Sequence, residues 1–434
     1  MSFEIITVFE SMLQLLSAAF NAPSGENFTL LMRGLVLCLG RPTVRNLLRA
    51  TDAEVGKHET AYHRFYSRAV WTVEEVVELL VKHVVVPRFT PEGRIRVCGD
   101  DTTAGKTGRK VAFASMFRDA IASSGGKNVV HWSHNWVILC LIVPSPFAKE
   151  RLLHIPLMGR LYRTEKQCKG GAKFRTRHEL LVEMVDLLKK WVGGRLIELS
   201  ADGAYASSQV IGSLAERIVF TSRIRRDATL YRVAPRRRKG QRGRPRLKGR
   251  KLPKLAAIAK TAKFKSEKAL MYGKHREVLV HSFIALWYHV SKRPIRVVIV
   301  RDKKGKQKDD YFFTTEVDRD AVEVVEEYAG RWGIEEAIRE LKQSLGFDEV
   351  QSWTKKAVLR QAPLVVIAHA IVQATYYASE SPDEITGEKT PSFARILTRL
   401  RTEMWKQRIK AISGQQKDMN KIFEALEKAI LTAA

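Results

Sequence analysis

The sequence predicts a mixed α/β protein of more than one domain. Three observations support this class. Apolar residues recur at helical spacing through residues 1–90, short apolar strands with polar ends begin at Arg94, and helical spacing returns from Ala321 onward. A chain of 434 residues with 45% hydrophobic content is long enough to fill the cores of two or three domains.

The chain is strongly basic. Its 75 lysines and arginines outnumber the 46 acidic residues and give a formal net charge of +29, with basic residues spread along most of the chain. This excess predicts a polyanionic partner, nucleic acid, bound largely through its phosphates. A membrane-surface protein would need a basic amphipathic helix or a lipidation signal, and we find neither, so no membrane partner is expected.

Cysteine usage and the N-terminal segment indicate a reducing compartment. The four cysteines are far apart and none forms a C-x2-C pair, so we expect neither a disulfide scaffold nor a zinc ribbon. The N-terminal segment lacks the positive region of a signal peptide. We therefore expect a cytoplasmic protein that is associated with the nucleoid in a bacterial cell.

Residues 1–90 are predicted to form a helical, DNA-binding N-terminal domain. Within it, a short helix over 43–49 is joined by a polar loop to a second helix over 60–68. Two short helices joined by a turn are compatible with a helix-turn-helix DNA reader. The alternative is a plain helical bundle with a polar outer face. The candidate reading residues are His58, Thr60, Tyr62, Arg64 and Arg68.

Residues 91–206 are predicted to form the first part of a catalytic core. A strand from Arg94 leads into Asp100 and Asp101, and a later strand leads into Asp202. Between them the pattern predicts two strands and a helix, over 135–143, 151–157 and 176–192. The ribonuclease-H-like fold has this order of elements: three strands, then a helix, then a strand that ends in aspartate. Ligands bind at the carboxyl ends of strands in α/β sheets, so these aspartates are candidate site residues.

Residues 207–318 alternate in the manner of strands and are predicted to form a β-rich insertion within the core. The insertion contains a basic arm, residues 236–251, with ten cations in sixteen residues. Its Arg-Gly-Arg-Pro segment can enter a narrow minor groove. The alternative is a solubilising loop, although like charges at this density repel one another without a polyanion. The candidate DNA contacts are Arg236, Arg237, Arg238, Arg244 and Arg246.

Residues 319–380 are predicted to complete the catalytic core with helices, including one over 355–379, and residues 381–434 to form a helical C-terminal region. A single helix that begins near Ala321 would carry a polar stripe, because residues three and four apart share one face. The alternative for its centre is an ordinary Arg–Glu pair on a solvated face. The stripe consists of Tyr328, Arg331, Glu335, Ile338 and Lys342.

The spacing Tyr-x2-Arg-x3-Glu-x6-Lys, from Tyr328 to Lys342, resembles the YREK signature of bacterial insertion-sequence transposases with a DDE catalytic triad, the cut-and-paste group. The resemblance covers about residues 60–370. In that family the aspartate directly before a Thr pair is the metal ligand, which matches Asp101. Asp100 remains the alternative, because strand alternation does not decide between the two. The resemblance implies a catalytic triad of Asp101, Asp202 and Glu335.

The chemistry of the triad suits phosphoryl transfer. Two-metal catalysis requires carboxylates from different elements to converge on cations about 3.5–4 Å apart, and Mg²⁺ prefers oxygen ligands. The resemblance implies two Mg²⁺ ions held by the triad, with Mn²⁺ as an expected substitute. It also implies that Tyr328, Arg331 and Lys342 hold phosphates at the transposon end.

Members of the family commonly carry an aromatic residue in the β insertion that stacks on a flipped base near the cleavage site. Trp287 is the candidate for this stacking. The alternative is a core tryptophan, because Trp287 lies within an apolar Leu-Trp-Tyr segment.

The resemblance implies a cut-and-paste DNA transposase, which nicks DNA at the ends of its element and joins the freed 3′-hydroxyl to target DNA. Its partners would be the terminal inverted repeats and the target, bound by a homodimer. Two alternatives stay open. One is a ribonuclease-H-like nuclease that cuts without strand transfer, and the other is a catalytically silent relic that only binds DNA. A product joined to target DNA separates the first alternative from the transposase.

Overall fold

The structure is a computed structural model that describes most of the chain. The described residues are 2–51, 56–119, 122–123, 126–169, 171–235, 243–380 and 390–413, together with Phe423 and Leu426. They form two compact units that interleave along the sequence. Unit 1 contains residues 1–91, 101–175 and 335–434, and unit 2 contains residues 92–100 and 176–334. The five domains expected from the sequence remain a prediction.

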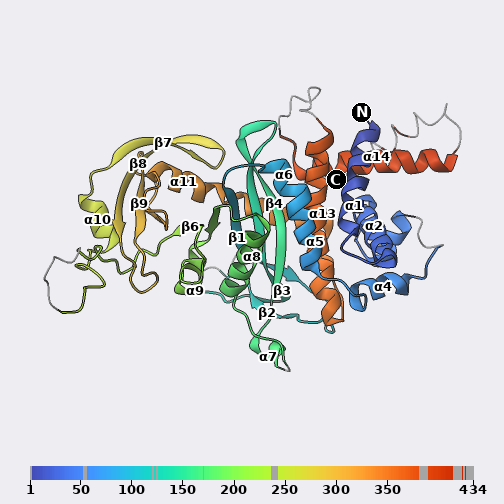
Figure 1. The fold of residues 1–434 in the computed structure, drawn as a ribbon, viewed down its shortest axis with the longest axis horizontal. Coiled ribbons are helices and arrows are strands. Elements are labelled where there is room, and N and C mark those ends of the chain that lie inside the picture. The colour runs from blue at the N-terminus through green and yellow to red at the C-terminus, as the bar shows by residue number, and fades with distance from the viewer. Residues whose placement is uncertain are drawn as a thin grey trace. The chain divides into compact units, whose positions relative to one another are not determined.

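Unit 1 begins with short helices that pack around one long apolar helix (Figure 1). The two helices expected near 43–49 and 60–68 are confirmed as α3 (Val44–Ala50) and α4 (Glu59–Ser67). Tyr62 was expected on the DNA-reading face, and this placement is wrong because α4 buries Tyr62 on its inner face with Phe65 and Tyr66. The other N-terminal helices are α1 (Ser2–Ser17), α2 (Ala22–Leu37), α5 (Val73–Leu79), the π-helical turn η1 (Leu80–Val85) and α6 (Val86–Phe89).

The long central helix is α13 (Lys355–Ser379), as the sequence predicts. Among the described helices, α13 alone is long and apolar enough to cross a membrane, but 89% of its apolar stretch is buried, as in the core of a folded unit. Its buried Arg360 donates hydrogen bonds to the carbonyls of Phe65, Tyr66 and Trp71, which fixes the end of α4. Helix α14 (Phe393–Ser413) also packs on α13.

Three antiparallel strands complete unit 1. They are β2 (Ser115–Arg118), β3 (Val130–Ser145) and β4 (Ala148–Tyr162), followed by the short helix α7 (Glu165–Cys168). β3 pairs with both β2 and β4, and α13 packs on β4. Pro156 of β4 lies opposite Cys140 where the register shifts, a position that tolerates the missing backbone N–H of proline.

Strand β1 (Ile95–Gly105) belongs to both units, since its residues up to Asp100 lie in unit 2 and the rest in unit 1. Its first part pairs in parallel with β5 (Ile197–Ala201), and α8 (Arg177–Trp191) packs against it. A Cβ atom at Gly99 would lie 2.4 Å from Leu181 Cδ1. A side chain at this position, immediately before the two candidate aspartates, would therefore require the Leu181 side chain to move.

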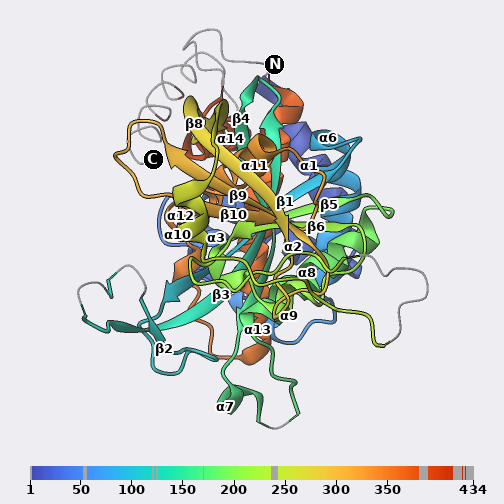
Figure 2. The same ribbon diagram turned by 90° about the vertical axis from the view of Figure 1, so that its left-hand side faces the viewer.

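The sheet of unit 2 runs in the order β1-β5-β6-β10-β9-β8-β7, with three parallel strands followed by an antiparallel series (Figures 1 and 2). The mixed α/β class is thereby confirmed, while the ribonuclease-H-like arrangement remains a prediction. The further strands are β6 (Ile218–Arg223), β7 (Lys265–Met271), β8 (Lys274–Ala285), β9 (Ile295–Asp302) and β10 (Asp310–Thr314). The short helices are η2 (Gly203–Tyr205), α9 (Ser208–Ile211) and α10 (Leu255–Thr261).

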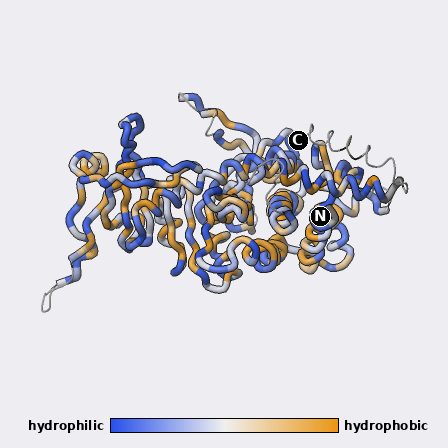
Figure 3. Tube along the Cα trace, turned by 90° about the horizontal axis from the view of Figure 1, so that it is seen from above, coloured by the Kyte–Doolittle hydropathy of each residue, from blue (hydrophilic) through white to orange (hydrophobic). Residues whose placement is uncertain are grey.

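Helix α11 (Ala321–Gly330) covers one face of these antiparallel strands. Val324, Val325, Tyr328 and Ala329 join one apolar cluster with residues of β7, β8, β9 and β10. Figure 3 shows hydrophobic stretches of this kind along the helices and strands of each unit, with hydrophilic residues in many of the loops. The Tyr328 ring is therefore part of the core, and helix α11 is held by apolar packing along its length.

The single helix expected across the Tyr-x2-Arg-x3-Glu-x6-Lys stretch is wrong. α11 ends at Gly330, and α12 (Gly333–Leu345) begins after a turn formed by Arg331 and Trp332. Glycines on both sides of this turn weaken a continuous helix, because glycine loses more backbone entropy there than other residues. The tyrosine and arginine of the stretch therefore do not share a helical stripe with its glutamate and lysine.

Candidate active site

Asp202 lies where the sequence predicts, directly after the buried strand β5. Its carboxylate caps the short helix η2 and accepts a hydrogen bond from the Ala204 backbone N–H at 3.4 Å. The residue is half-buried. A carboxylate at the carboxyl end of a parallel strand, next to a helix start, is well placed to bind a cationic ligand.

Unit 2 gathers Tyr328 and Arg331 around the end of β5 and the middle of β1. Asp100 and Asp101 were expected at the end of a strand, and this placement is wrong because β1 continues past them to Gly105. The Tyr328 hydroxyl lies 3.5 Å from Asp202 Oδ1, and Arg331 Nη1 donates to Asp100 Oδ2 at 3.0 Å. The Arg331 guanidinium also lies 5.4 Å from the centre of the Tyr328 ring. Two residues of the signature are therefore in contact with two of the candidate aspartates.

The charges of this cluster support one another. Arg331 is only 4% exposed, and burial alone would lower the pKa of its guanidinium. Tyr328, Asp100 and Asp202 reverse this effect and raise the pKa of Arg331 above its ordinary value. Burial raises the pKa of the Tyr328 phenol, which stays neutral and able to donate a hydrogen bond. The cluster thus presents a permanent cation and a hydroxyl donor beside Asp202.

Asp101 belongs to unit 1, where a buried amide holds it. Asn135 Nδ2, on β3, donates to Asp101 Oδ2 at 3.1 Å, and Asn135 is 2% exposed. The Asn135 Oδ1 atom is buried and has no hydrogen-bond partner among the described residues. Asn135 orients the Asp101 carboxylate, whereas the neighbouring carboxylate of Asp100 is bound to Arg331.

Lys342 is tied to the same strand as Asp101. Its ammonium donates to the Thr103 carbonyl at 2.7 Å and lies 3.9 Å from the Asp348 carboxylate. Lys106, which sequence analysis did not single out, donates to the Asp348 carbonyl at 2.7 Å. Burial lowers the pKa of Lys106 to about 8. Two lysines therefore stand beside the last residues of β1 in unit 1.

Glu335 lies in the first turn of α12 and is exposed, next to the equally exposed Glu336. Acidic residues are favoured there by the helix dipole. The three predicted ligands offer only carboxylate oxygens, a donor set that suits Mg²⁺. Across the described residues, no three His, Cys, Asp or Glu side chains form a group that could hold a metal ion. Asp101 and Glu335 belong to unit 1, and Asp202 belongs to unit 2.

Comparison with known families decides the class of the protein. A family model described as DDE superfamily endonuclease matches residues 15–283, more than half of the chain. The chain belongs to this family. The match includes Asp100, Asp101 and Asp202 and ends before Tyr328, so it does not cover the signature stretch. The expected enzyme class is confirmed at this level, as a DDE endonuclease.

Two other comparisons add little to the assignment of this DDE endonuclease. No curated protein matches the chain. Among solved structures, the chain is similar to the piggyBac transposase in a synaptic complex with hairpin DNA, with 13% identity and a TM-score of 0.41. That likeness covers 98% of this chain and 82% of the other. The assignment therefore rests on the family match alone.

Trp287 of the endonuclease lies in the core, which agrees with its interpretation as a core tryptophan and not as a residue that stacks on a base. It is 6% exposed and its ring packs edge-on against Phe313, with 5.6 Å between ring centres. Two other aromatic residues of unit 2 are open to solvent. Trp332 is 55% and Tyr272 46% exposed, and their rings meet edge-on at 5.7 Å. Arg276 lies 5.5 Å from the Tyr272 ring.

Sequence reasoning missed this exposed aromatic pair, although two signals pointed to it. Trp332 directly follows Arg331 in the signature stretch, and Tyr272 precedes Gly273 in the tight β7–β8 turn. Tyr272 has a positive φ of 54°, which is uncommon for a residue with a bulky side chain.

The basic arm is anchored at its base. The Arg232 N–H donates to the Arg250 carbonyl, and the Gly249 N–H donates to the Arg232 carbonyl, both at 2.8 Å. Lys248 Nζ lies 4.1 Å from the Tyr231 ring and 4.6 Å from the Tyr288 ring. Among the predicted DNA contacts, two are described and exposed, Arg244 and Arg246, and three lie outside the described residues, Arg236, Arg237 and Arg238.

Proposed function

We propose that this DDE endonuclease is a cut-and-paste DNA transposase of a bacterial insertion sequence. It would cleave DNA at the ends of its element and join the freed 3′-hydroxyl to target DNA. The observation that carries the proposal is the contact of Tyr328 and Arg331 with Asp202 and Asp100 in unit 2. In a DDE endonuclease, these contacts bring part of the Tyr-x2-Arg-x3-Glu-x6-Lys stretch to the two strands that carry the acidic residues, at the end of β5 and in the middle of β1.

The proposed metal ligands are Asp101, Asp202 and Glu335, which would hold two Mg²⁺ ions, or Mn²⁺ in their place. When bound, such ions activate a water or a 3′-hydroxyl and stabilise the leaving oxygen. The contact between Asp100 and Arg331 supports the choice of Asp101, because the Asp100 carboxylate is already engaged by a buried cation. Asp101 is instead oriented by an amide that carries no charge.

The remaining signature residues bind and orient the DNA strand in this proposal. Arg331 stays charged at every accessible pH, and its buried guanidinium, held by Asp100, would act on a nearby phosphate through its charge. The Tyr328 hydroxyl donates a hydrogen bond beside Asp202, and Lys342 contributes charge beside β1. Preorganised cations of this kind stabilise the charge that develops on a phosphate during transfer.

The proposed DNA contacts outside the signature are the basic arm and an aromatic pair. Trp332 and Tyr272 replace Trp287 as the candidates for stacking on an unpaired base, because they are exposed and Trp287 is buried. Arg244 and Arg246 of the basic arm are exposed and available to the minor groove. The proposed partners are terminal inverted repeats and target DNA, bound by a homodimer in the cytoplasm at the nucleoid.

A cleavage assay tests the proposal. A labelled duplex carrying the inverted repeats that flank the gene is incubated with the protein and Mg²⁺, beside Glu335→Ala and the matched control Glu336→Ala. We expect a nick at the repeat boundary with wild type and with the control, and none with Glu335→Ala. Binding without cleavage in Mg²⁺ or Mn²⁺ would leave only a DNA-binding relic, and absence of binding would refute the proposal.

One alternative is favoured by a specific observation. The matching family is described as endonucleases, so a ribonuclease-H-like nuclease that cuts without strand transfer also fits it. Adding an unlabelled target plasmid separates the two functions. A labelled strand joined to the plasmid supports a transposase, whereas cut ends that never join support the nuclease.

A further inference from the structure

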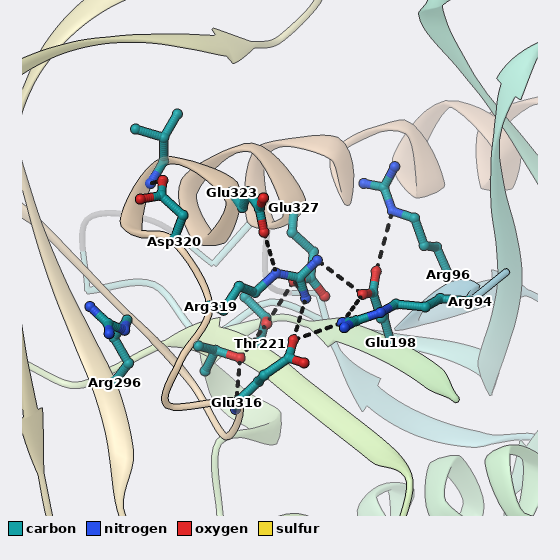
Figure 4. A network of polar contacts seen from close by, with 12 residues as sticks. Arg94, Arg96, Glu198, Thr221, Arg296, Glu316, Arg319, Asp320, Glu323 and Glu327 are labelled. Carbon is teal, nitrogen blue, oxygen red and sulfur yellow. Dashed lines mark hydrogen bonds and ion pairs between the residues drawn. The ribbon is translucent and has the colours of Figure 1, made fainter. Parts of the chain in front are cut away.

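A buried ionic cluster lies inside unit 2, where side chains from α11, β5 and β6 meet (Figure 4). Glu198 of β5 and Glu327 of α11 are each 3% exposed. Arg319, just before α11, bridges them, with 2.7 Å from Nη1 to Glu327 Oε2 and 3.0 Å from Nη2 to Glu198 Oε1. Thr221 of β6 donates to the same oxygen of Glu327 at 2.9 Å. None of these residues belongs to the proposed site.

Four further charged groups surround this centre. Arg94, directly before β1, binds Glu198 and Glu316, both at 2.8 Å. Arg96 lies 3.8 Å from Glu198, while Glu316 and Glu323 lie 3.7 and 3.6 Å from Arg319. The groups that act on the Glu327 carboxylate are therefore Arg319, Glu198, Thr221 and Arg96.

The cluster joins the elements that carry the proposed site. Glu198 lies on β5 and Asp202 directly follows this strand, so the strand that binds Arg319 also leads into a proposed ligand. Glu327 directly precedes Tyr328, whose hydroxyl reaches Asp202. Because Glu327 anchors α11 to β5 and β6, the position of the following residue, Tyr328, along β5 is also fixed.

Stability alone does not account for such a cluster. Burying several charges carries a large desolvation cost, and well-packed apolar residues of similar size often give an equally stable protein. The apolar packing between α11 and its strands has little directional character, whereas charged hydrogen bonds fix distances and angles. The cluster therefore supplies alignment, which the hydrophobic face of α11 does not.

We propose that Arg319 and Glu327 are positioning residues, which fix α11 along β5 and β6 so that Tyr328 and Arg331 meet Asp202 and Asp100. This inference rests on the proposed function, because it assigns the alignment to DNA cleavage. It adds two residues that lie outside the signature and touch neither DNA nor the proposed ligands.

The charge state of Glu327 gives the inference a distinct signature. Burial raises the pKa of Glu327 to about 7, although Arg319 opposes this shift. Above that pH the carboxylate is ionised and pairs with Arg319, and below it the protonated form loses the ion pair. We expect cleavage at saturating DNA to rise as pH increases through about 7, through this group.

The test compares Glu327→Gln and Arg319→Lys with wild type, and uses Glu277→Gln as the matched control on β8, where Glu277 is 66% exposed and lies outside the buried cluster. Rates are measured in single turnover with saturating repeat DNA from about pH 6 to 8.5, and DNA affinity is measured separately. Misplacement of a reacting group by about 1 Å can cost about 10²-fold in rate. We expect a loss of about 10–100-fold in cleavage rate at pH 8 for both variants, a DNA affinity within about threefold of wild type, and no inflection near pH 7 in Glu327→Gln. The control should behave as wild type.

Each outcome decides the inference. Wild-type rate and pH profile in folded Glu327→Gln would overturn it, whatever the melting temperature of the variant. If Glu327→Gln does not fold, the wild-type profile decides, and a flat profile across about pH 7 overturns the inference. If the wild-type protein does not cleave DNA, the proposed function fails. The rate of hydrogen exchange in α11 then tests whether Arg319 and Glu327 position this helix. Faster exchange of α11 amides in Arg319→Lys, without a lower melting temperature, supports it, and unchanged exchange overturns it.

Discussion

Asp100 and Asp101 are neighbours in the chain, and their replacement by asparagine should have opposite consequences. Asp100 neutralises Arg331, and the side chains of this pair are 21% and 5% exposed. Asp101 accepts a hydrogen bond from the neutral Asn135 amide, and that contact does not depend on charge. Asp100→Asn should therefore act on stability, and Asp101→Asn on catalysis.

The magnitude follows from the burial of Arg331. Removing one partner of a buried ion pair costs about 3–5 kcal/mol, because the other charge stays buried without compensation. Asp100 is partly exposed, asparagine keeps an acceptor oxygen, and Asp202 also stabilises the guanidinium, so we expect the free energy of unfolding to fall by about 1–3 kcal/mol. Asp101→Asn can still accept from Asn135 and should change it by less than about 1 kcal/mol.

The assay combines denaturant unfolding of both variants with cleavage of the repeat duplex in Mg²⁺. We expect Asp101→Asn to be as stable as wild type and inactive, and Asp100→Asn to be destabilised with residual cleavage. The opposite pattern, a stable and inactive Asp100→Asn beside a destabilised and active Asp101→Asn, would refute the reasoning. It would make Asp100 the ligand and remove the structural role of its contact with Arg331.

Three further predictions concern other parts of the chain. Trp332→Ala should weaken the binding of repeat DNA by about 1–3 kcal/mol in a binding titration and leave the free energy of unfolding unchanged. Trp287→Ala should instead lower the free energy of unfolding by about 3–5 kcal/mol in a denaturant titration. Arg246→Ala should reduce the slope of log affinity for DNA against log salt by about 0.9, while Lys303→Ala, which removes a cation already paired with Glu277, should not. Burial lowers the pKa of His134 to about 4, below the unfolded value of about 6.5. The unfolded state thus binds the proton first, so stability should fall by up to about 3 kcal/mol as pH drops from about 6.5 to 4, and His134→Gln should flatten this loss.

The order of the elements could be predicted from the sequence because each has a strong local pattern. The bounds of α13 follow from its continuous apolar run, and Asp202 follows the short apolar strand that the pattern indicates. Each of these features depends on residues close together in the chain. Such local patterns are sufficient to predict the mixed α/β class.

The break between α11 and α12 could not be predicted in the same way. The spacing of Tyr328, Arg331 and Glu335 fits one helix, and two glycines in a helical pattern are only a weak signal against it. The deciding contact joins Arg331 to Asp100, 231 positions away in the chain. Local spacing carries no information about such a partner.

The buried ionic cluster and the two tryptophans show the same limit. Glu198 occupies a strand whose pattern gives no sign that its side chain is buried, and its partner Arg319 lies 121 positions away. Trp287 could be assigned from the sequence either to the core or to a base-stacking role, and the structure shows that it is buried whereas Trp332 is exposed. Exposure of a large side chain is decided by which strand or helix covers it, and this is settled only by the tertiary structure.

The hydrogen-bonded base of the basic arm has a practical consequence. Because Arg232 and Arg250 already hold the two ends together, the entropy of closing the loop depends only weakly on how many residues lie between them. The segment between these residues can therefore be treated as an exchangeable cassette, replaced by a shorter turn or by a segment of different composition without unfolding unit 2. If the basic arm contacts DNA as proposed, grafting at this point would change which DNA the protein prefers while the proposed metal ligands stay untouched.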